Sequence, residues 1–310
     1  MKPLVVFIVG PTAVGKTAVS LELAKQIDAE IISCDSMQIY KGMDILSSKP
    51  SLEQRKKTAH HLIDVAAPQD EFNVSQFRKM SLEAVSDILS RKKVPLFVGG
   101  TGLYMSVVVD GIFEAKAEDA AVRQRLFEQD QEHGSGFLHR QLTKVDPQAA
   151  AKIHANDTKR LVRALEVFAV TGIPISELQK KRQGLERDHL VMIFGLRLPL
   201  ERLYERINKR VDEMFEDGLV DEVKRLIGQP LSRTAFAAIG IPEVAGYLKG
   251  EYSLDEAMSL MKQHTRQFAR RQMTWFRKDE RVRWIDVEDM EVQQVCDEIN
   301  AQMSDTRGSL

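Results

Sequence analysis

The sequence predicts an α/β protein with a core sheet of parallel strands and a helical insertion. Three observations support this prediction. The chain opens with an apolar, β-branched run at 4–9 that enters a glycine-rich loop and then a helical pattern. Further apolar runs, each of strand length, occur at 30–33, 94–98 and 191–196. The stretch from 114 to 187 instead has many charges and helical spacing, with no clear strand.

The composition is that of a globular protein with room for one large domain and an insertion. The chain has 310 residues, with 44 Lys and Arg against 45 Asp and Glu. Because these charges balance, a nucleic-acid-binding surface would have to come from local clusters. Cys34 and Cys296 have no disulfide or metal-site spacing, which indicates a reducing compartment. With no signal peptide and no apolar run near the roughly 20 residues of a membrane span, we expect a cytoplasmic enzyme. We also expect a monomer.

The glycine-rich loop has the spacing of a phosphate-binding P-loop, G-x-x-x-x-G-K-[ST]. Its glycines let backbone N–H groups turn toward a phosphate, and the next helix presents the positive end of its dipole. The lysine adds a charge, and the threonine hydroxyl can hold Mg²⁺. Alone, the loop indicates a bound polyphosphate, such as that of ATP, or a diphosphate, and it predicts a P-loop NTPase-like core. The predicted phosphate-binding residues are Gly10, Pro11, Thr12, Ala13, Val14, Gly15, Lys16 and Thr17.

The other core elements are expected to follow in alternation. A helix should end near Ile27, and strands are expected at 30–33, 60–65 and 94–98, with a helix at 77–89 before the last of these. In open α/β sheets, loops at the carboxyl ends of strands line the ligand crevice. The loop that begins at Cys34 should therefore face the phosphate loop.

The second half of the chain returns to the sheet after the insertion. We expect the core at 1–113 plus 188–310, and the insertion at 114–187. A single long amphipathic helix is predicted over 200–226, where Arg202, Arg206 and Arg210 recur every four residues and share one face. A further helix is predicted at 254–276, followed by a short strand at 282–285, and the residues after Ser304 are expected to fray.

Asp35 is the first candidate for chemistry beyond the phosphate loop. A carboxylate at a strand end beside a diphosphate site could hold Mg²⁺ or act as a general base. It could equally cap the N-terminus of a following helix. Its position in the sequence leaves these alternatives open.

A second candidate is the Gly-Gly-Thr-Gly turn at 99–102. In ATP-hydrolysing P-loop proteins the corresponding strand usually ends in an acidic residue of the magnesium site. Here the strand ends in glycines, which permit close approach of a ligand to the backbone, and in the hydroxyl of Thr101. The turn therefore departs from the pattern of nucleotide hydrolases.

Basic residues form a third group. Lys159, Arg160 and Arg163 share one predicted helix of the insertion. Between 262 and 283 there are eight Lys or Arg and two acids, interleaved with aromatic residues including Phe276. Such a helix suits a nucleic-acid backbone, although charge runs are more often solvated faces.

Taken together, these stretches resemble the tRNA dimethylallyltransferase family. The matching stretches run in family order across most of the chain and are more specific than the phosphate loop alone. They are Gly10–Thr17, Asp35–Tyr40, Met43–Ile45, His60–Asp64, Gly99–Tyr104, Asn156–Asp157, Arg160, Arg163–Val167 and Arg271–Trp275.

The resemblance implies transfer of a dimethylallyl group from dimethylallyl diphosphate to N6 of adenine-37, beside the tRNA anticodon, with release of diphosphate. It implies that Asp35 is the general base, that Thr101 lies at the target base, and that Thr17 helps to hold Mg²⁺. We expect Arg210 to help stabilise the leaving diphosphate. The insertion and the basic C-terminal helix would hold the anticodon arm. The implied tRNA contacts are Asp35, Ser36, Met37, Gln38, Thr101, Arg123, Lys159, Arg160 and Arg163.

The chain departs from the family pattern in two places. The stretch 45–50 has other residues where the pattern prefers a glycine and a threonine before Lys49 and Pro50. In the second place, Ile241 and Pro242 follow Gly240, where a tyrosine usually follows the glycine. The second departure lies in a segment expected to contact tRNA.

Three alternatives remain at this point. A small-molecule P-loop kinase would use the insertion as a lid and would consume ATP. An enzyme that prenylates free AMP would turn over without tRNA. A nucleotide-dependent switch or tRNA-binding module would have no catalytic activity, although the lack of an Asn-Lys-x-Asp stretch argues against a GTPase.

Overall fold

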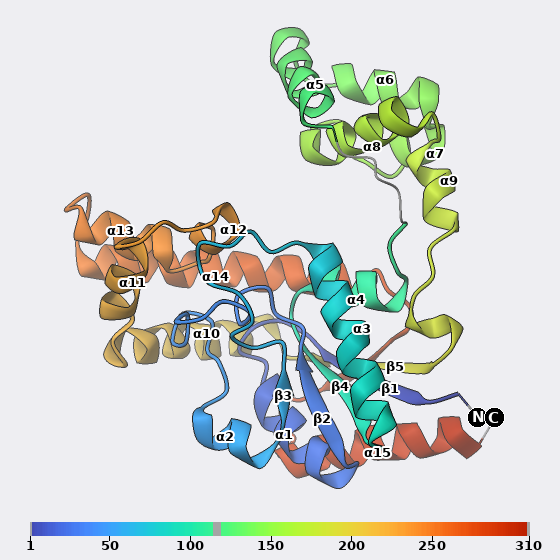
Figure 1. Ribbon diagram of the computed structural model, residues 1–310. Helices are drawn as coiled ribbons and strands as arrows, with labels where there is room; N and C mark the ends of the chain where they lie inside the picture. The colour runs from blue at the N-terminus through green and yellow to red at the C-terminus, as the bar shows by residue number, and fades with distance from the viewer. Residues whose placement is uncertain (1, 114–118, 309–310) are drawn as a thin grey trace. The chain divides into compact units, whose positions relative to one another are not determined.

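The computed structural model describes residues 2–113 and 119–308, which form two compact units. Unit 1 comprises Met1–Val109 and Leu185–Leu310, and unit 2 comprises Asp110–Gly184. Residues 114–118 of the predicted insertion lie outside the described residues. Figure 1 shows the elements of both units.

Unit 1 contains a six-stranded parallel sheet, which confirms the predicted fold class. The strand order is β3-β2-β4-β1-β5-β6, with β1 in the interior between β4 and β5 (Figure 1). Every residue of β1 is buried, as expected for a parallel strand covered on both faces. Val9 is in register with Gly99 on β4 and Gly195 on β5, so the loops that follow these strands meet at one edge. The strands are β1 Leu4–Val9, β2 Ala29–Ser33, β3 His60–His61, β4 Val94–Gly99, β5 Leu190–Arg197 and β6 Val282–Asp286.

Helices cover both faces of this sheet. On one face the apolar side chains of α1 and α15 join Val6 and Ile8 of β1 in the main hydrophobic cluster. On the other face Phe7 stacks on Phe97 with ring centroids 4.4 Å apart, and α3 packs beside α4. These helices are α1 Lys16–Gln26, α3 Val74–Ser90, α4 Gly102–Val109 and α15 Val292–Gly308. Since α15 continues to Gly308, the expectation that the chain frays after Ser304 is wrong for residues 305–308, and the last two residues lie outside those described.

Further helices of unit 1 build a second hydrophobic cluster with the segment 39–66. They are α10 Leu200–Glu216, α11 Leu219–Ile227, α12 Arg233–Phe236, α13 Ile241–Leu248 and α14 Leu254–Phe276. The short helices α2 Leu52–Lys57 and η1 Leu185–Arg187 also belong to unit 1. The cluster includes Met43 of the segment and Val211, Val244 and Met261 of the helices. It therefore fixes the loop after β2 against the helices that follow β5.

Two predicted elements differ in the structure. The single helix over 200–226 is wrong, because Gly218 adopts φ +96° and separates α10 from α11. The strand expected at 60–65 has only two residues, since Leu62 and Asp64 have φ values of +61° and +58°. Residues in this left-handed region cannot continue a strand.

Every described element of unit 2 is a helix. Helices α5 and α6 pack against α8, and their apolar residues, such as Leu138, Leu142 and Leu161, form a separate core. The helices are α5 Ala120–His133, α6 Phe137–Val145, α7 Pro147–Ala150, α8 Thr158–Thr171 and α9 Ile175–Lys180. Across both units, none of the described helices is both long and apolar enough to cross a membrane.

A buried carboxylate holds the loop that carries the first departure from the family pattern. Glu222 of α11 is 2% exposed and accepts hydrogen bonds from the backbone N–H groups of Asp44, Ile45 and Leu46 at 2.8–3.0 Å. Three backbone N–H groups stabilise the ionised carboxylate, and the carboxylate gives each of them a hydrogen-bond acceptor. This contact supplies an acceptor to the backbone of residues 44–46, which form no helix or strand.

Replacing this carboxylate should destabilise the protein. Glu222→Ala leaves three amide groups without their acceptor, and we expect a loss of about 2–4 kcal/mol in the free energy of unfolding. Urea unfolding measures the loss, with exposed Asp221→Ala on the same helix as control. Equal stability of the two variants would show that Glu222 does not hold the loop.

Candidate active site

The phosphate loop turns sharply between β1 and α1. Gly10, Ala13 and Gly15 have positive φ values of +142°, +64° and +108°. Gly10 must lack a side chain, because a Cβ there would lie 2.6 Å from the carbonyl oxygen of Leu196. The loop thus needs glycine both for its backbone angles and for its contact with the neighbouring strand.

Lys16 lies over the loop at the start of α1. Its Nζ donates hydrogen bonds to the carbonyl oxygens of Gly10 at 2.9 Å and Pro11 at 2.7 Å. Burial lowers the pKa of Lys16 to about 7, although the negative charge of Asp35 acts in the opposite direction. An anion bound in the loop would favour the charged ammonium and reverse this shift.

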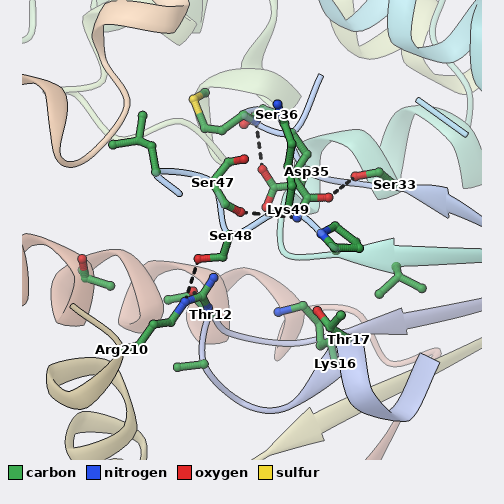
Figure 2. A pocket seen from close by; sticks show the side chains of 18 of the residues that line it. Thr12, Lys16, Thr17, Ser33, Asp35, Ser36, Ser47, Ser48, Lys49 and Arg210 are labelled. Carbon is green, nitrogen blue, oxygen red and sulfur yellow. Dashed lines mark hydrogen bonds between the residues drawn. The ribbon is translucent and has the colours of Figure 1, made fainter. Parts of the chain in front are cut away.

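A second cation reaches the loop from α10. Arg210 donates from Nη1 to the Thr12 hydroxyl at 3.0 Å and from Nε to the Ser48 hydroxyl at 2.9 Å (Figure 2). Burial lowers its pKa, but a guanidinium remains charged in proteins. Arg206 contacts the loop at the carbonyl oxygen of Val14, 3.4 Å away, so two of the three arginines spaced along this helix meet the phosphate loop.

Asp35 follows β2 and faces the same cavity (Figure 2). Its Oδ1 accepts a hydrogen bond from the backbone N–H of Met37 at 2.8 Å, which closes a local turn. No helix begins there among the described residues, because the next one, α2, is capped by Ser51. The helix-cap interpretation of Asp35 is therefore wrong, and the choice between base and metal ligand stays a prediction.

The turn after β4 holds the Asp35 segment in place. Thr101 accepts a hydrogen bond from the Ser36 N–H at 3.1 Å through Oγ1, and its own N–H donates to the Cys34 carbonyl at 3.2 Å. Gly99 has no room for a side chain, since a Cβ would lie 2.0 Å from the same carbonyl oxygen. The glycines therefore allow β4 and the loop after β2 to lie in direct contact.

These segments enclose a cavity of about 630 Å³. Its polar lining includes residues of the phosphate loop, α10, α14 and the loop after β2, and the side chains labelled in Figure 2 surround a common space. Of the predicted site residues, it is lined by Thr12, Ala13, Gly15, Lys16, Thr17, Asp35, Ser36, Met37, Gln38 and Arg210. Apolar side chains line the rest of it, including Leu46, Ile207, Val211, Met214, Ile239 and Met261. Thr101 is linked to the lining through Ser36 rather than being part of it.

The donor set suits a magnesium ion that is bound mainly through a substrate. The described residues contain no cluster of three or more His, Cys, Asp or Glu that could hold a metal alone. The Thr17 side chain lies at the start of α1 in the cavity lining. Mg²⁺ commonly keeps several waters and is held by few protein ligands together with phosphate oxygens. Thr17 therefore fits the predicted role, provided that a diphosphate is bound.

Sequence reasoning missed two residues that organise this site. Lys49 is buried, with its side chain 1% exposed, and its Nζ donates to the Tyr40 carbonyl and the Asp64 carboxylate, each at 2.6 Å. Gln272 of α14 joins the backbones of Thr12 and Gly100. Gln272 lies in the family-like stretch 271–275 and Lys49 in the departing stretch 45–50, but the sequence pattern reveals the contacts of neither.

The predicted tRNA-contacting residues of unit 2 lie on α5 and α8. Arg123 and Arg163 meet the buried carboxylate of Glu166 at 3.0 and 2.9 Å. Burial acts to raise the pKa of Glu166, but the Asp119 N–H and these two guanidinium groups outweigh it and lower the pKa. Glu166 thus gathers the two arginines, while Lys159 and Arg160 are exposed.

The basic C-terminal stretch is less available than its sequence suggests. Lys262 forms an ion pair with Asp212 at 2.5 Å, and Arg281 pairs with Asp279 at 2.7 Å. Phe276 is fully buried in the core, so its interpretation as part of an aromatic nucleic-acid surface is wrong. Trp275 is 38% exposed, and Arg271 lies over the Phe268 ring at 5.7 Å.

Comparison with known proteins decides the family. A model of the IPP transferase family matches residues 38–279. The tRNA dimethylallyltransferase of Geobacter metallireducens is 45% identical over 289 residues, covering 92% of this chain and 93% of the relative. That of Thermotoga maritima is 48% identical over 277 residues, covering 89% and 90%. The chain belongs to the tRNA dimethylallyltransferase family.

Solved structures agree with this assignment. The tRNA isopentenylpyrophosphate transferase of Bacillus halodurans is 37% identical, with a TM-score of 0.73 and 99% of both chains covered. A eukaryotic dimethylallyltransferase, described as acting on tRNA, is 28% identical with a TM-score of 0.78, covering 93% of this chain and 74% of that one. The family consists of prenyltransferases, so the family resemblance is confirmed and the kinase and non-catalytic alternatives are set aside.

The Lys16 pKa predicts proton uptake when the loop binds an anion. At about pH 8 the free side chain is mostly neutral, because its pKa is about 7, whereas a bound diphosphate requires the ammonium form. We therefore expect uptake of most of one proton with inorganic diphosphate at pH 8 and little at pH 6. Calorimetry in two buffers of different ionisation enthalpy measures this uptake.

Lys16→Met is the matched control for this measurement. Proton exchange by the diphosphate itself occurs with either protein, so the difference between them isolates the lysine. Equal uptake by both proteins at pH 8 would contradict a lowered Lys16 pKa.

Proposed function

We propose that this protein transfers a dimethylallyl group from dimethylallyl diphosphate to N6 of adenine-37, next to the tRNA anticodon. The observation that carries the proposal is one cavity lined by a carboxylate, Asp35, and by basic residues that include Lys16 and Arg210 at the phosphate loop (Figure 2). A carboxylate can take a proton from an amine, while the cations can hold a leaving diphosphate. The relatives' names give the substrate as tRNA and the group as dimethylallyl.

The reaction breaks the bond between C1 of the donor and its bridging oxygen. The electron pair of that bond leaves with diphosphate, and the N6 lone pair forms the new bond to C1. Because this lone pair is delocalised into the purine ring, N6 is a weak nucleophile and must lose a proton as the bond forms. Asp35 accepts that proton, and diphosphate and prenylated tRNA are the products.

The phosphate loop stabilises charge on the leaving group. Negative charge grows on the diphosphate as the C–O bond breaks, and the donors of the loop are already oriented toward it. Lys16 and Arg210 add positive charge at a buried site, where electrostatic interactions are strong. Mg²⁺, held by Thr17 and the diphosphate oxygens, would supply further charge neutralisation.

The apolar part of the cavity suits the hydrocarbon tail of the donor. Leu46, Val211, Met214 and Met261 present only carbon and sulfur there. Leu46 belongs to the first departure from the family pattern, and Ser48 of the same stretch supplies the hydroxyl that Arg210 contacts. The departing stretch thus places an apolar side chain in the proposed donor site and supplies a hydroxyl that Arg210 contacts.

The target base must leave its stack to reach Asp35. An adenine amine is not accessible within a stacked loop, so the enzyme takes the base into a pocket. Thr101 would lie at the target base, and Ser36 to Gln38, together with Arg123, Lys159, Arg160 and Arg163, would contact the anticodon arm. We propose that the protein acts as a monomer in the cytoplasm, where it meets its tRNA substrates.

Asp35→Asn should abolish most of the transfer. The amide keeps an oxygen that can accept from the Met37 N–H but cannot take the N6 proton, so we expect a rate loss of about 10²–10⁴-fold. The assay is incubation with tRNA and labelled dimethylallyl diphosphate, followed by mass analysis of the nucleosides. Affinity for tRNA should stay within a few-fold.

Exposed Asp87→Asn serves as the control, because this carboxylate lies on α3 and pairs with Arg91 outside the cavity. Near-normal transfer by Asp35→Asn would show that Asp35 is not the general base. Turnover of free AMP by the unmodified enzyme at the rate seen with tRNA would instead favour a nucleotide prenyltransferase.

A further inference from the structure

We propose that Gln272 is a positioning residue that sets the separation between the leaving diphosphate and the groups at the target base. This inference rests on the proposed function, because it takes the phosphate loop as the diphosphate site and the Asp35 segment as the site of the target base. Gln272 lies on α14, far in sequence from both of the loops that it joins.

The side-chain amide of Gln272 uses both of its ends. Its Oε1 accepts a hydrogen bond from the Thr12 N–H at 2.9 Å, and its Nε2 donates to the Gly100 carbonyl at 2.9 Å. The residue is 6% exposed, so water does not readily compete for these bonds. One planar amide therefore connects the phosphate loop directly to the turn after β4.

On the donor side, this contact reaches the groups that hold the diphosphate. Thr12 is bound through its N–H by Gln272 and through its hydroxyl by Arg210 at 3.0 Å. The amide that Gln272 binds lies in the same loop as Lys16. A change at Gln272 therefore acts on the position of the loop without removing a cation.

On the acceptor side, the contact reaches the proposed base. Gly100 directly precedes Thr101, which binds the Ser36 N–H at 3.1 Å and the Cys34 carbonyl at 3.2 Å. These two residues flank Asp35. The contacts that begin at Thr12 and pass through Gln272 and Thr101 therefore reach both neighbours of the Asp35 carboxylate.

The fit around the amide is tight. A Cβ at Gly100 would lie 2.0 Å from Nε2 of Gln272, so the glycine is required for the side chain to reach the backbone. The turn after β4 therefore uses its second glycine to accept this residue. In the proposed mechanism this gives the Gly-Gly-Thr turn a role in geometry instead of in metal binding.

Loss of this contact should affect the chemical step more than substrate binding. Transfer requires N6, C1 and the bridging oxygen to be nearly in line, and a misplacement of about 1 Å can cost about 100-fold in rate. We expect Gln272→Ala to lower kcat by about 10²-fold, with KM for each substrate within about threefold.

Gln272→Glu gives a sharper test, because its hydrogen bonding depends on pH. The ionised carboxylate still accepts from Thr12 but presents an oxygen to the Gly100 carbonyl, which repels it. A protonated carboxyl has one donor and one acceptor, like the amide. Its activity relative to the unmodified enzyme should therefore rise as pH falls, whereas that of Gln272→Ala should not.

Gln267→Ala and Gln267→Glu on the same helix are the matched controls, because Gln267 is exposed and outside the cavity lining. Both should match the unmodified enzyme at every pH. Steady-state kinetics with tRNA and dimethylallyl diphosphate, together with thermal unfolding, separates a rate effect from a loss of fold.

The outcomes distinguish the two proposals. If the unmodified enzyme transfers no dimethylallyl group to tRNA, the proposed function fails. If it is active and Gln272→Ala keeps its kcat, or raises KM in proportion to its loss of kcat/KM, the positioning role is overturned. A Gln272→Glu profile parallel to that of Gln272→Ala at every pH would also overturn it.

Discussion

The site depends on two basic side chains, Lys16 and Arg210, which the fold partly buries at the phosphate loop before any substrate arrives. Burial makes the charged form of Lys16 costly enough to lower its pKa to about 7, and it lowers the pKa of Arg210 as well. Loop carbonyls and hydroxyls compensate this cost only in part. A bound diphosphate would restore the missing negative charge. The sheet, the left-handed glycines of the loop and α10 together keep these cations in place.

The leaving-group role proposed for the phosphate loop also explains why the turn after β4 differs from the corresponding strand end of a nucleotide hydrolase. When the loop holds a leaving group, no acidic residue is needed to activate water at the end of β4. That strand instead ends in glycines, which allow the backbone to contact Cys34 and Gln272. The result is a site in which the proposed donor-binding and acceptor-binding segments are joined by hydrogen bonds to the backbone. Asp35 then lies between hydrogen-bonded neighbours, with its carboxylate toward the cavity.

Local patterns in the sequence predict the strands, the phosphate loop and the position of Asp35, because each depends on neighbouring residues. Contacts between distant segments are not predictable in this way. Gln272 and Thr12 are 260 positions apart, and Glu222 contacts Leu46 from 176 positions away. Phe276 is a case in which the local pattern misleads. Its charged neighbours in the sequence suggest an exposed position, but the helix directs its side chain into the core.

The most direct test of the leaving-group role is to follow the bridging oxygen of the donor. Dimethylallyl diphosphate carrying ¹⁸O between C1 and the first phosphorus would be incubated with the enzyme and tRNA, and both products would be examined by mass spectrometry. Cleavage of the C–O bond places the label in diphosphate, in amounts equal to the prenylated adenosine. Label that stays with the dimethylallyl group, or phosphate found on the tRNA, would show that the loop holds a group under attack and would contradict the mechanism.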